Sequence, residues 1–256
     1  MAMLPNPLPK LADDPTGSSL GLQLPPGTVL DAEGHPALLW YADEPAAPGV
    51  WTSLLPARRA AGLHPVLLDV EEQAPEDWDL DPGMMSYPGD HDPEEVLAEL
   101  WESEEDEESW PGLAPAQETS ADPDDRAAEV ASSFIEEKWS KDFRAALVPA
   151  RRSADIPAAI GWTGPVNYEP DVAALCSVLR SWEDRFGIRV VALAFDQLIL
   201  SVAAPPKTLA EAEAVAAEHF AFCPDNINQG KDDYDDLSAY AEQEILGKDF
   251  WRFWWD

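Results

Sequence analysis

The chain has 256 residues, of which 45% are hydrophobic, so it is long enough to build one large domain or two small ones around a real core. Its 50 acidic and 16 basic residues give a net charge of −34, which argues against free nucleic acid and anionic membrane surfaces as partners, because phosphate groups are repelled. The two cysteines, Cys176 and Cys223, are too few for a disulfide framework and favour a reduced, cytoplasmic protein. The first residues do not show a signal-peptide pattern, and no apolar run is long enough to span a membrane.

The first part of the chain has the pattern of a small α/β unit. An apolar run at 37–42 between turn residues predicts a buried strand, and the apolar residues of 49–61 recur at helical spacing and stop before Gly62. Residues 65–70 predict a second buried strand. Strand, helix and strand form a βαβ unit, so we predict a small α/β unit within residues 1–90.

The middle of the chain carries most of the charge. Residues 69–125 contain 22 acidic residues and no lysine or arginine. Asp92 as N-cap and Pro93 behind it predict a helix start, so residues 91–125 are interpreted as an acidic helix and linker. Two interpretations stay open: a solvated linker, or a surface that imitates nucleic-acid charge and engages a basic partner. The residues of this candidate surface are Glu94, Glu95, Glu99, Glu102, Glu104, Glu105, Asp106, Glu107 and Glu108.

The sequence pattern of the second part, residues 126–256, predicts an α+β domain. Its expected elements, in chain order, are a strand at 145–148, a helix at 170–186, a hairpin at 188–202, a helix from 208 to Pro224, a short helix at 236–246 and a strand at 250–255. This order is that of a ferredoxin-like split βαβ sheet with helices on one face. The aromatic residues of the last segment predict a central or well-covered final strand.

Several spaced motifs of this second part form a recognisable set. They are Gly161-Trp162-x-Gly164, Leu179-Arg180-x-Trp182-Glu183-x-Arg185-Phe186-Gly187, Glu218-His219-x-Ala221-Phe222-Cys223-Pro224-Asp225, Gln229-Gly230 and Phe253-Trp254-Trp255-Asp256. Over about residues 144–256 the chain resembles the bacterial family known as domain of unknown function 4253. The resemblance implies relationship and supplies no activity.

The common catalytic signatures are not found in the sequence. Dinucleotide and P-loop glycine motifs, the nucleophile elbow, the His-Glu-x-x-His motif and an EF-hand loop are all missing. No cofactor and no metal are therefore expected, and no catalytic residue is assigned. His219 and Cys223, four residues apart, form either a base and its nucleophile, a pair of metal ligands, or a core cysteine beside a histidine at a helix end.

The segment that follows Cys223 is the candidate ligand or partner loop. Asp225, Asn226, Asn228 and Gln229 offer carboxylate and amide groups that either bind a ligand or stabilise the loop through Asx-turns. We group this loop with His219 and Cys223, and with Trp162, Arg180 and Glu183 from neighbouring elements.

These observations favour a non-enzymatic, cytosolic, acidic binding protein of inhibitor or immunity type that engages a basic protein. Two alternatives stay open. One is an enzyme that uses His219, Cys223 and the loop at 225–229; the other is a plain structural or scaffold domain. The oligomeric state is left open.

Overall fold

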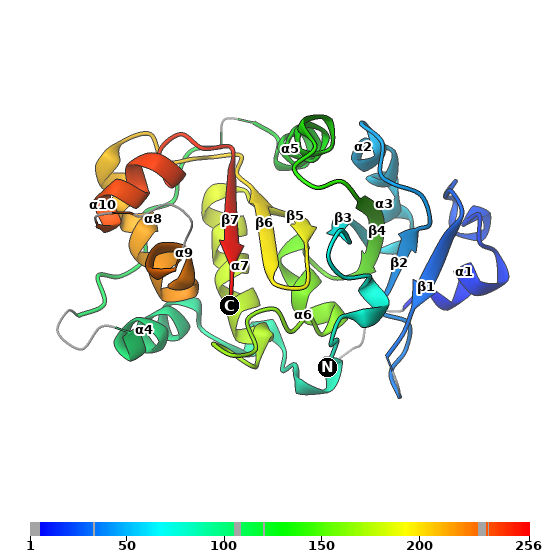
Figure 1. Ribbon diagram of the computed structural model, residues 1–256, viewed down its shortest axis with the longest axis horizontal. Coiled ribbons are helices and arrows are strands. Elements are labelled where there is room, and N and C mark those ends of the chain that lie inside the picture. The colour runs from blue at the N-terminus through cyan, green and yellow to red at the C-terminus, as the bar shows by residue number, and fades with distance from the viewer. Residues whose placement is uncertain (1–5, 33, 105–108, 120, 230–233, 235) are drawn as a thin grey trace.

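The structure is a computed structural model that describes residues 6–32, 34–104, 109–119, 121–229, 234 and 236–256 (Figure 1). Its strands are β1 (Gly27–Leu30), β2 (Leu39–Ala42), β3 (Leu63–Asp69), β4 (Phe143–Pro149), β5 (Arg189–Leu193), β6 (Gln197–Ser201) and β7 (Phe250–Trp254). Its helices are α1 (Pro9–Asp13), α2 (Val50–Leu54), α3 (Pro56–Ala61), α4 (Pro93–Glu104), α5 (Pro123–Glu137), α6 (Ile156–Ile160), α7 (Val172–Phe186), α8 (Leu209–Phe222), α9 (Asp225–Asn228) and α10 (Leu237–Tyr240), the last continuing into a π-helical turn, Ala241–Ile245.

The strands of the described residues form one seven-stranded mixed sheet in the order β1-β2-β4-β3-β5-β6-β7. The strand at its centre, β3, pairs antiparallel with β4 over seven positions and parallel with β5. Strand β6 pairs antiparallel with β5 on one side and with β7 on the other. The protein is therefore a mixed α/β protein in which one sheet includes strands from both parts of the chain.

The expected ferredoxin-like layout is not confirmed. In that layout the strands of the second part pair only among themselves, whereas here β3, from the first part, lies between β4 and β5. The reason is the composition of β3, whose residues Leu63–Leu68 are all buried. A strand buried on both faces is stabilised when both of its edges are paired inside a sheet.

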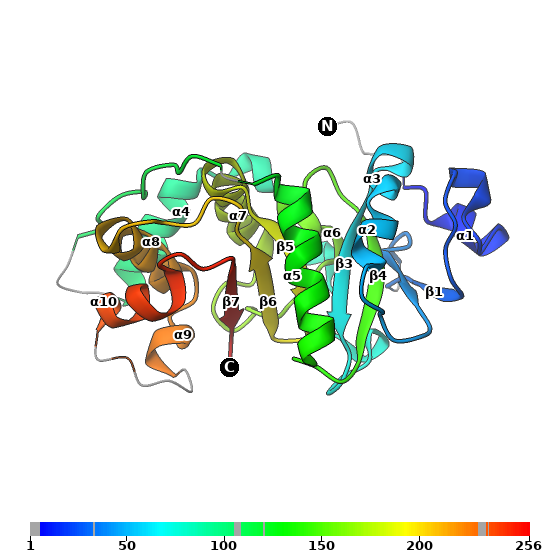
Figure 2. The ribbon, with the colours of Figure 1, turned by 90° about the horizontal axis from the view of Figure 1, so that it is seen from above.

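Helices cover both faces of the sheet, so the expectation of helices on one face is wrong for this sheet. Val66 and Leu68 of β3 pack in the same cluster as α7 and α8, while Leu67, between them, packs against α5. Successive strand residues point to opposite faces, which places α5 and α7 on opposite sides of the sheet (Figure 2). Around β1 and β2, α1 and the α2–α3 pair add a smaller cluster.

Local signals predicted several helix boundaries correctly. The side chain of Asp92 accepts from the backbone amides at the start of α4, and Asp171 does the same for α7. Thr208 and Glu211 form the expected capping box of α8. Gly187 ends α7 with a φ of 63°, a conformation that favours glycine.

The acidic segment packs on the folded body at several places among the described residues. Leu97, Leu100 and Trp101 of α4 are buried in the cluster that also contains α7 and α8. Farther along, the backbone amide of Gln117 donates to the carbonyl oxygen of Arg185 at 3.0 Å. Helix α5, which the sequence analysis did not predict, follows directly. Within the described residues, no helix combines the length and apolar character needed to cross a membrane.

Candidate functional site

The predicted loop after Cys223 folds into the short helix α9, which lies against the edge strand β7 (Figure 1). The side-chain amide of Asn226 donates to the carbonyl oxygen of Arg252 at 2.6 Å, and its oxygen accepts from the backbone amide of Trp254 at 3.0 Å. These two bonds are the ones that a neighbouring strand would make. The amide chemistry predicted for the loop is therefore used, in part, to cover the open edge of the sheet.

The Cys223 thiol is fully buried behind this edge. It donates to the carbonyl oxygen of Trp254 at 3.0 Å, and burial raises the pKa of the thiol well above its ordinary value. A cysteine nucleophile needs the opposite, a lowered pKa and access to substrate. The geometry therefore favours a structural donor at this position over the nucleophile considered from the sequence.

His219 is enclosed by aromatic rings. The centroid of its ring lies 4.6 Å from that of Trp251 and 4.8 Å from that of Phe253, and its Nδ1 lies 3.1 Å from the hydroxyl of Tyr240. Burial lowers the pKa of His219 to about 3, so the imidazole is neutral near pH 7. Its Nε2 has no hydrogen-bond partner among the described residues.

A cavity of about 680 Å³ lies between β7, the end of α5 and the segment from α10 to Lys248. Its lining consists of Glu72, Trp139, Asp196, Gln197, Asn226, Gln229, Tyr234, Tyr240, Glu244, Lys248, Phe250, Trp251, Arg252 and Trp254. Two predicted residues, Asn226 and Gln229, therefore border this cavity. The aromatic and acidic residues around them were not singled out from the sequence, because they come from elements far apart in the chain.

A second cavity, of about 330 Å³, lies on the other side of α9. It brings two separate predictions together, because Glu104 of the acidic surface lines it with Asp225, Asn228 and Gln229 of the loop. Asn167, Tyr168, Pro224, Trp255 and Asp256 complete its lining. Gln229 lines both cavities, so α9 stands between two adjoining hollows.

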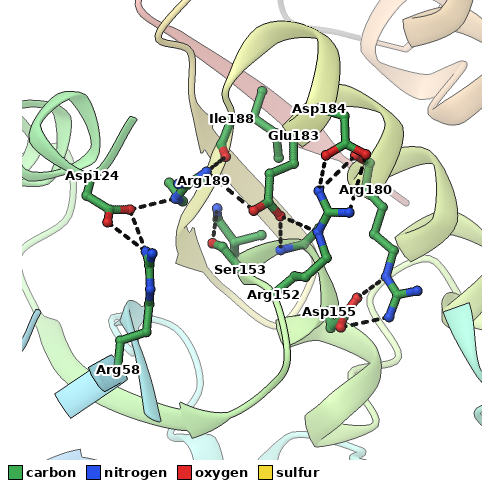
Figure 3. A network of polar contacts seen from close by, with 12 residues as sticks. Arg58, Asp124, Arg152, Ser153, Asp155, Arg180, Glu183, Asp184, Ile188 and Arg189 are labelled. Atoms are coloured by element: carbon green, nitrogen blue, oxygen red, sulfur yellow. Dashed lines mark hydrogen bonds and ion pairs between the residues drawn. The ribbon is translucent and has the colours of Figure 1, made fainter. Parts of the chain in front are cut away.

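The other residues grouped with the loop lie elsewhere. Trp162 is buried: its indole N–H donates to the carbonyl oxygen of Ala194 at 2.8 Å, and its ring meets that of Trp255 edge-on. Arg180 and Glu183 project from α7 into a network of ion pairs and line neither of the two cavities (Figure 3). The structure thus separates Trp162, Arg180 and Glu183 from the loop.

One half of this network joins elements from both parts of the chain (Figure 3). Asp124, at the start of α5, pairs with Arg58 of α3 at 2.6 Å and with Arg189 of β5 at 2.7 Å. Burial raises the pKa of Asp124, but the hydrogen bonds and charges of Arg189 and Arg58 outweigh this effect and lower it. Arg189 also reaches Glu183 of α7 at 3.4 Å.

The other half of the network holds the segment that precedes α6 against α7 (Figure 3). Arg180 pairs with both oxygens of Asp155, at 2.5 and 2.8 Å, and its guanidinium lies over the ring of Tyr87. Arg152 pairs with Glu183 at 3.4 Å and with Asp184 at 2.5 Å. Both halves of the network together hold four arginines and four carboxylates, so the charges balance. This balance favours a structural clamp over a ligand site.

A second buried ion pair anchors the acidic segment. Glu218 of α8 is completely buried and pairs with the guanidinium of Arg185 at 2.7 and 2.6 Å. It also accepts from the indole of Trp182 and from the backbone amide of Ala114. All of its oxygens are thus satisfied by donors, as a buried carboxylate requires.

The acidic residues of α4 form its outer face. Glu94, Glu95, Glu99, Glu102 and Glu104 are all exposed, and none of them forms an ion pair with another described residue. Glu105, Asp106, Glu107 and Glu108 of the predicted surface lie outside the described residues. No group of three or more potential metal ligands is found in the described part of the chain.

The fold and these cavities define a mixed α/β protein with a candidate binding site around α9. Residues 144–256 match the family described as Domain of unknown function (DUF4253), and this confirms over the same residues the resemblance seen in the sequence. Searches among curated proteins and among solved structures gave no match.

Proposed function

We propose that this is a non-enzymatic binding protein of the bacterial cytoplasm that engages a basic protein through the outer face of α4 and the surface around α9. The proposal covers inhibitor and immunity-type roles, in which one protein occupies the charged surface of another. Both cysteines are free and buried, which suits a reducing compartment.

The observation that carries the proposal is the direction in which the acidic residues of α4 point. The apolar residues of this helix face α7 and α8, and its carboxylates face solvent without cationic partners in the described structure. Glu104, at the end of the helix and one turn beyond Leu100, borders the smaller cavity, where Asp225 and Asp256 add carboxylates. The helix therefore presents an acidic outer face, and its C-terminal end adjoins an acidic concave surface.

Physical chemistry favours a basic protein as the partner. A surface of one sign speeds encounter with a surface of the opposite sign and disfavours partners of like charge. Nucleic acid carries the same sign as this protein, so the field repels it. Weak divalent-cation binding by single carboxylates would not use the aromatic residues that line both cavities.

The proposal is tested by capture from a bacterial lysate with two charge variants. In the first, Glu94, Glu95, Glu99 and Glu102 are changed to glutamine; in the second, the exposed residues Asp13, Asp31, Glu44 and Glu136 are changed to the corresponding amides, which gives the same net charge. We expect the wild type and the second variant to retain a basic protein, identified by mass spectrometry, and the first variant to retain much less of it. Equal retention by both variants would contradict the proposal.

A further inference from the structure

The lining of the larger cavity has an unusual composition. Six of its fourteen residues are aromatic, three carry amides, three carry carboxylates and two are cationic; none of these lining residues is aliphatic. Ligand pockets are ordinarily lined largely by hydrophobic side chains with a few polar groups. Rings combined with planar polar groups suit an occupant that is itself planar and polar.

Asp196, in the turn between β5 and β6, is the carboxylate in this lining with an unmet hydrogen-bonding need. Its Oδ2 accepts from the indole N–H of Trp254 at 2.9 Å. Its Oδ1 is shielded from solvent and has no partner among the described residues. Burial raises the pKa of Asp196, which reflects a carboxylate that lacks a compensating cation. The other oxygen of Asp196, Oδ2, receives the bond from Trp254, so a cationic donor in the cavity would add a second bond there.

Aromatic residues line the same cavity as this carboxylate. Trp139, just beyond the end of α5, is 46% exposed, and its ring meets that of Phe250 at right angles with the centroids 5.3 Å apart. The Trp254 ring is half-buried and is fixed by its bond to Asp196. A guanidinium group stacks flat on such rings while an N–H at its edge donates to a carboxylate oxygen, a combination that the compact ammonium group does not offer.

We propose that the larger cavity receives an arginine side chain of the basic partner, with the guanidinium on Asp196 and its aliphatic stem against the rings of Trp139 and Trp254. This inference rests on the proposed function and names the residue by which the partner is recognised. Charge complementarity supports this occupant, because three carboxylates from separate elements, Glu72, Asp196 and Glu244, line one cavity of a protein with a net charge of −34.

The cationic residues of the lining provide a test of whether the occupant of the cavity is positively charged. Lys248 and Arg252 border the same cavity and repel an incoming guanidinium. Arg252 is exposed on β7, so its side chain can be shortened at little cost to the fold. We expect Arg252→Ala to strengthen binding of an arginine peptide about threefold, which unchanged or weakened binding would contradict.

The main experiment compares two peptides, capped hexa-arginine and capped hexa-lysine, on the full chain at low salt. Binding is measured by calorimetry and by tryptophan fluorescence. We expect hexa-arginine to bind about tenfold more tightly than hexa-lysine, because only the guanidinium combines flat stacking on the rings with donation to the carboxylate. Equal affinities would overturn the inference, since they would show that only the overall charge is sensed.

Two variants and a matched control locate the site. Asp196→Asn keeps the shape and the acceptor for Trp254 but removes the charge, and Trp139→Ala removes a ring that is 46% exposed and packs on Phe134 and Phe250. Asp31→Asn removes the same charge beyond β1, at the opposite edge of the sheet. We expect the first two variants to abolish the preference for arginine and the control to keep it. A preference that survives in Trp139→Ala would overturn the inference even if Asp196→Asn failed to fold.

The peptide assay is independent of the capture experiment. If hexa-arginine binds at the cavity but no basic protein is captured through α4, the proposed function fails and the arginine site stands. If a basic protein is captured through α4 and the cavity variants leave its binding unchanged, the proposed function stands and the arginine site fails.

Discussion

At the scale of single residues, Asn226 shows that the sequence identifies a polar side chain but does not identify its hydrogen-bond partners. The amides after Cys223 indicated a polar site, and Asn226 does border the larger cavity. Its two strong hydrogen bonds, however, go to the backbone of the chain's own edge strand. The sequence could not show this, because the pairing depends on where β7 lies in space.

The first prediction concerns this edge. Changing Asn226 to alanine leaves a strand carbonyl and a strand amide without their partner, and we expect the free energy of unfolding to fall by about 1–3 kcal/mol. Asn228→Ala, on the same short helix, is the control, because the Asn228 side chain is exposed. Urea unfolding measures both variants. Equal stability of the two would show that solvent replaces the Asn226 bonds without cost.

The second prediction concerns two buried histidines. Burial, followed by the charges of Arg58 and Arg189, lowers the pKa of His64 to about 4, and burial lowers that of His219 to about 3. In the unfolded chain both titrate near the ordinary value of about 6.5. Below that pH the unfolded state binds more protons than the folded state, so acid destabilises the fold.

We therefore expect the free energy of unfolding to fall by about 1.4 kcal/mol per pH unit for each histidine as the pH drops from 6.5 toward 4. His64→Gln should make this pH dependence shallower by one proton. The exposed His35, changed in the same way, should leave it unaltered. Urea titrations at pH 7, 6 and 5 supply the slope, and an unchanged slope in His64→Gln would contradict the assignment of a neutral, buried imidazole.

At the scale of elements, the sequence predicted helices with strong caps and failed where the outcome depended on long-range pairing. Asp171 caps the start of α7 and Gly187 ends it, close to the expected bounds of 170–186, because capping is decided within a few residues. The final strand was expected to be central or well covered. It is not central, because β7 is an edge strand, but α9 covers its outer edge, and Trp251 and Phe253 are buried on one face while Arg252 is exposed on the other.

The amino-acid composition is a poor guide to the structure of residues 109–119. Their acidic surroundings predicted a solvated linker, yet Ala114 donates to Glu218 and accepts from Arg185. Both of these partners were visible in the sequence as members of the family motifs. Nothing in the spacing of those motifs indicated that a segment about 70 to 100 residues away would be held by them.

The third prediction tests this anchor. Glu218→Gln leaves the buried guanidinium of Arg185 without its counter-charge, and we expect a loss of about 3–5 kcal/mol in the free energy of unfolding. Limited proteolysis should then cut the chain within 109–119. Glu242→Gln, at an exposed position, should change neither property. A Glu218→Gln protein as stable as the wild type would show that the pair contributes nothing beyond its own desolvation cost.

At the scale of the whole molecule, one sheet joins the two parts of the chain that the composition separates. The composition change at residues 69–125 predicted two halves, but β3 of the first half pairs with β4 and β5 of the second. The ion pairs of Asp124 with Arg58 and Arg189 join α3, α5 and β5 in the same way. Composition reports which segments are solvated; it does not report which strands become neighbours.

The fourth prediction follows from this shared sheet. Residues 126–256 expressed alone lack β3, so β4 loses its seven-position partner and β5 its parallel one. We expect this fragment to be unfolded or aggregated, and the full chain to unfold in one transition with equal calorimetric and van't Hoff enthalpies. A folded fragment, or two separate transitions in the full chain, would contradict the shared core.

The claim that an acidic surface binds a basic protein is tested most directly by the salt dependence of the affinity for the captured partner. The dissociation constant is measured between 0.05 and 0.5 M NaCl for the wild type and for the variant with glutamine at Glu94, Glu95, Glu99 and Glu102. Exposed charges are screened over about 10 Å at 0.1 M salt, so we predict a steep loss of affinity for the wild type and a much shallower one for the variant. An affinity that does not change with salt, or the same slope for both proteins, would contradict the account.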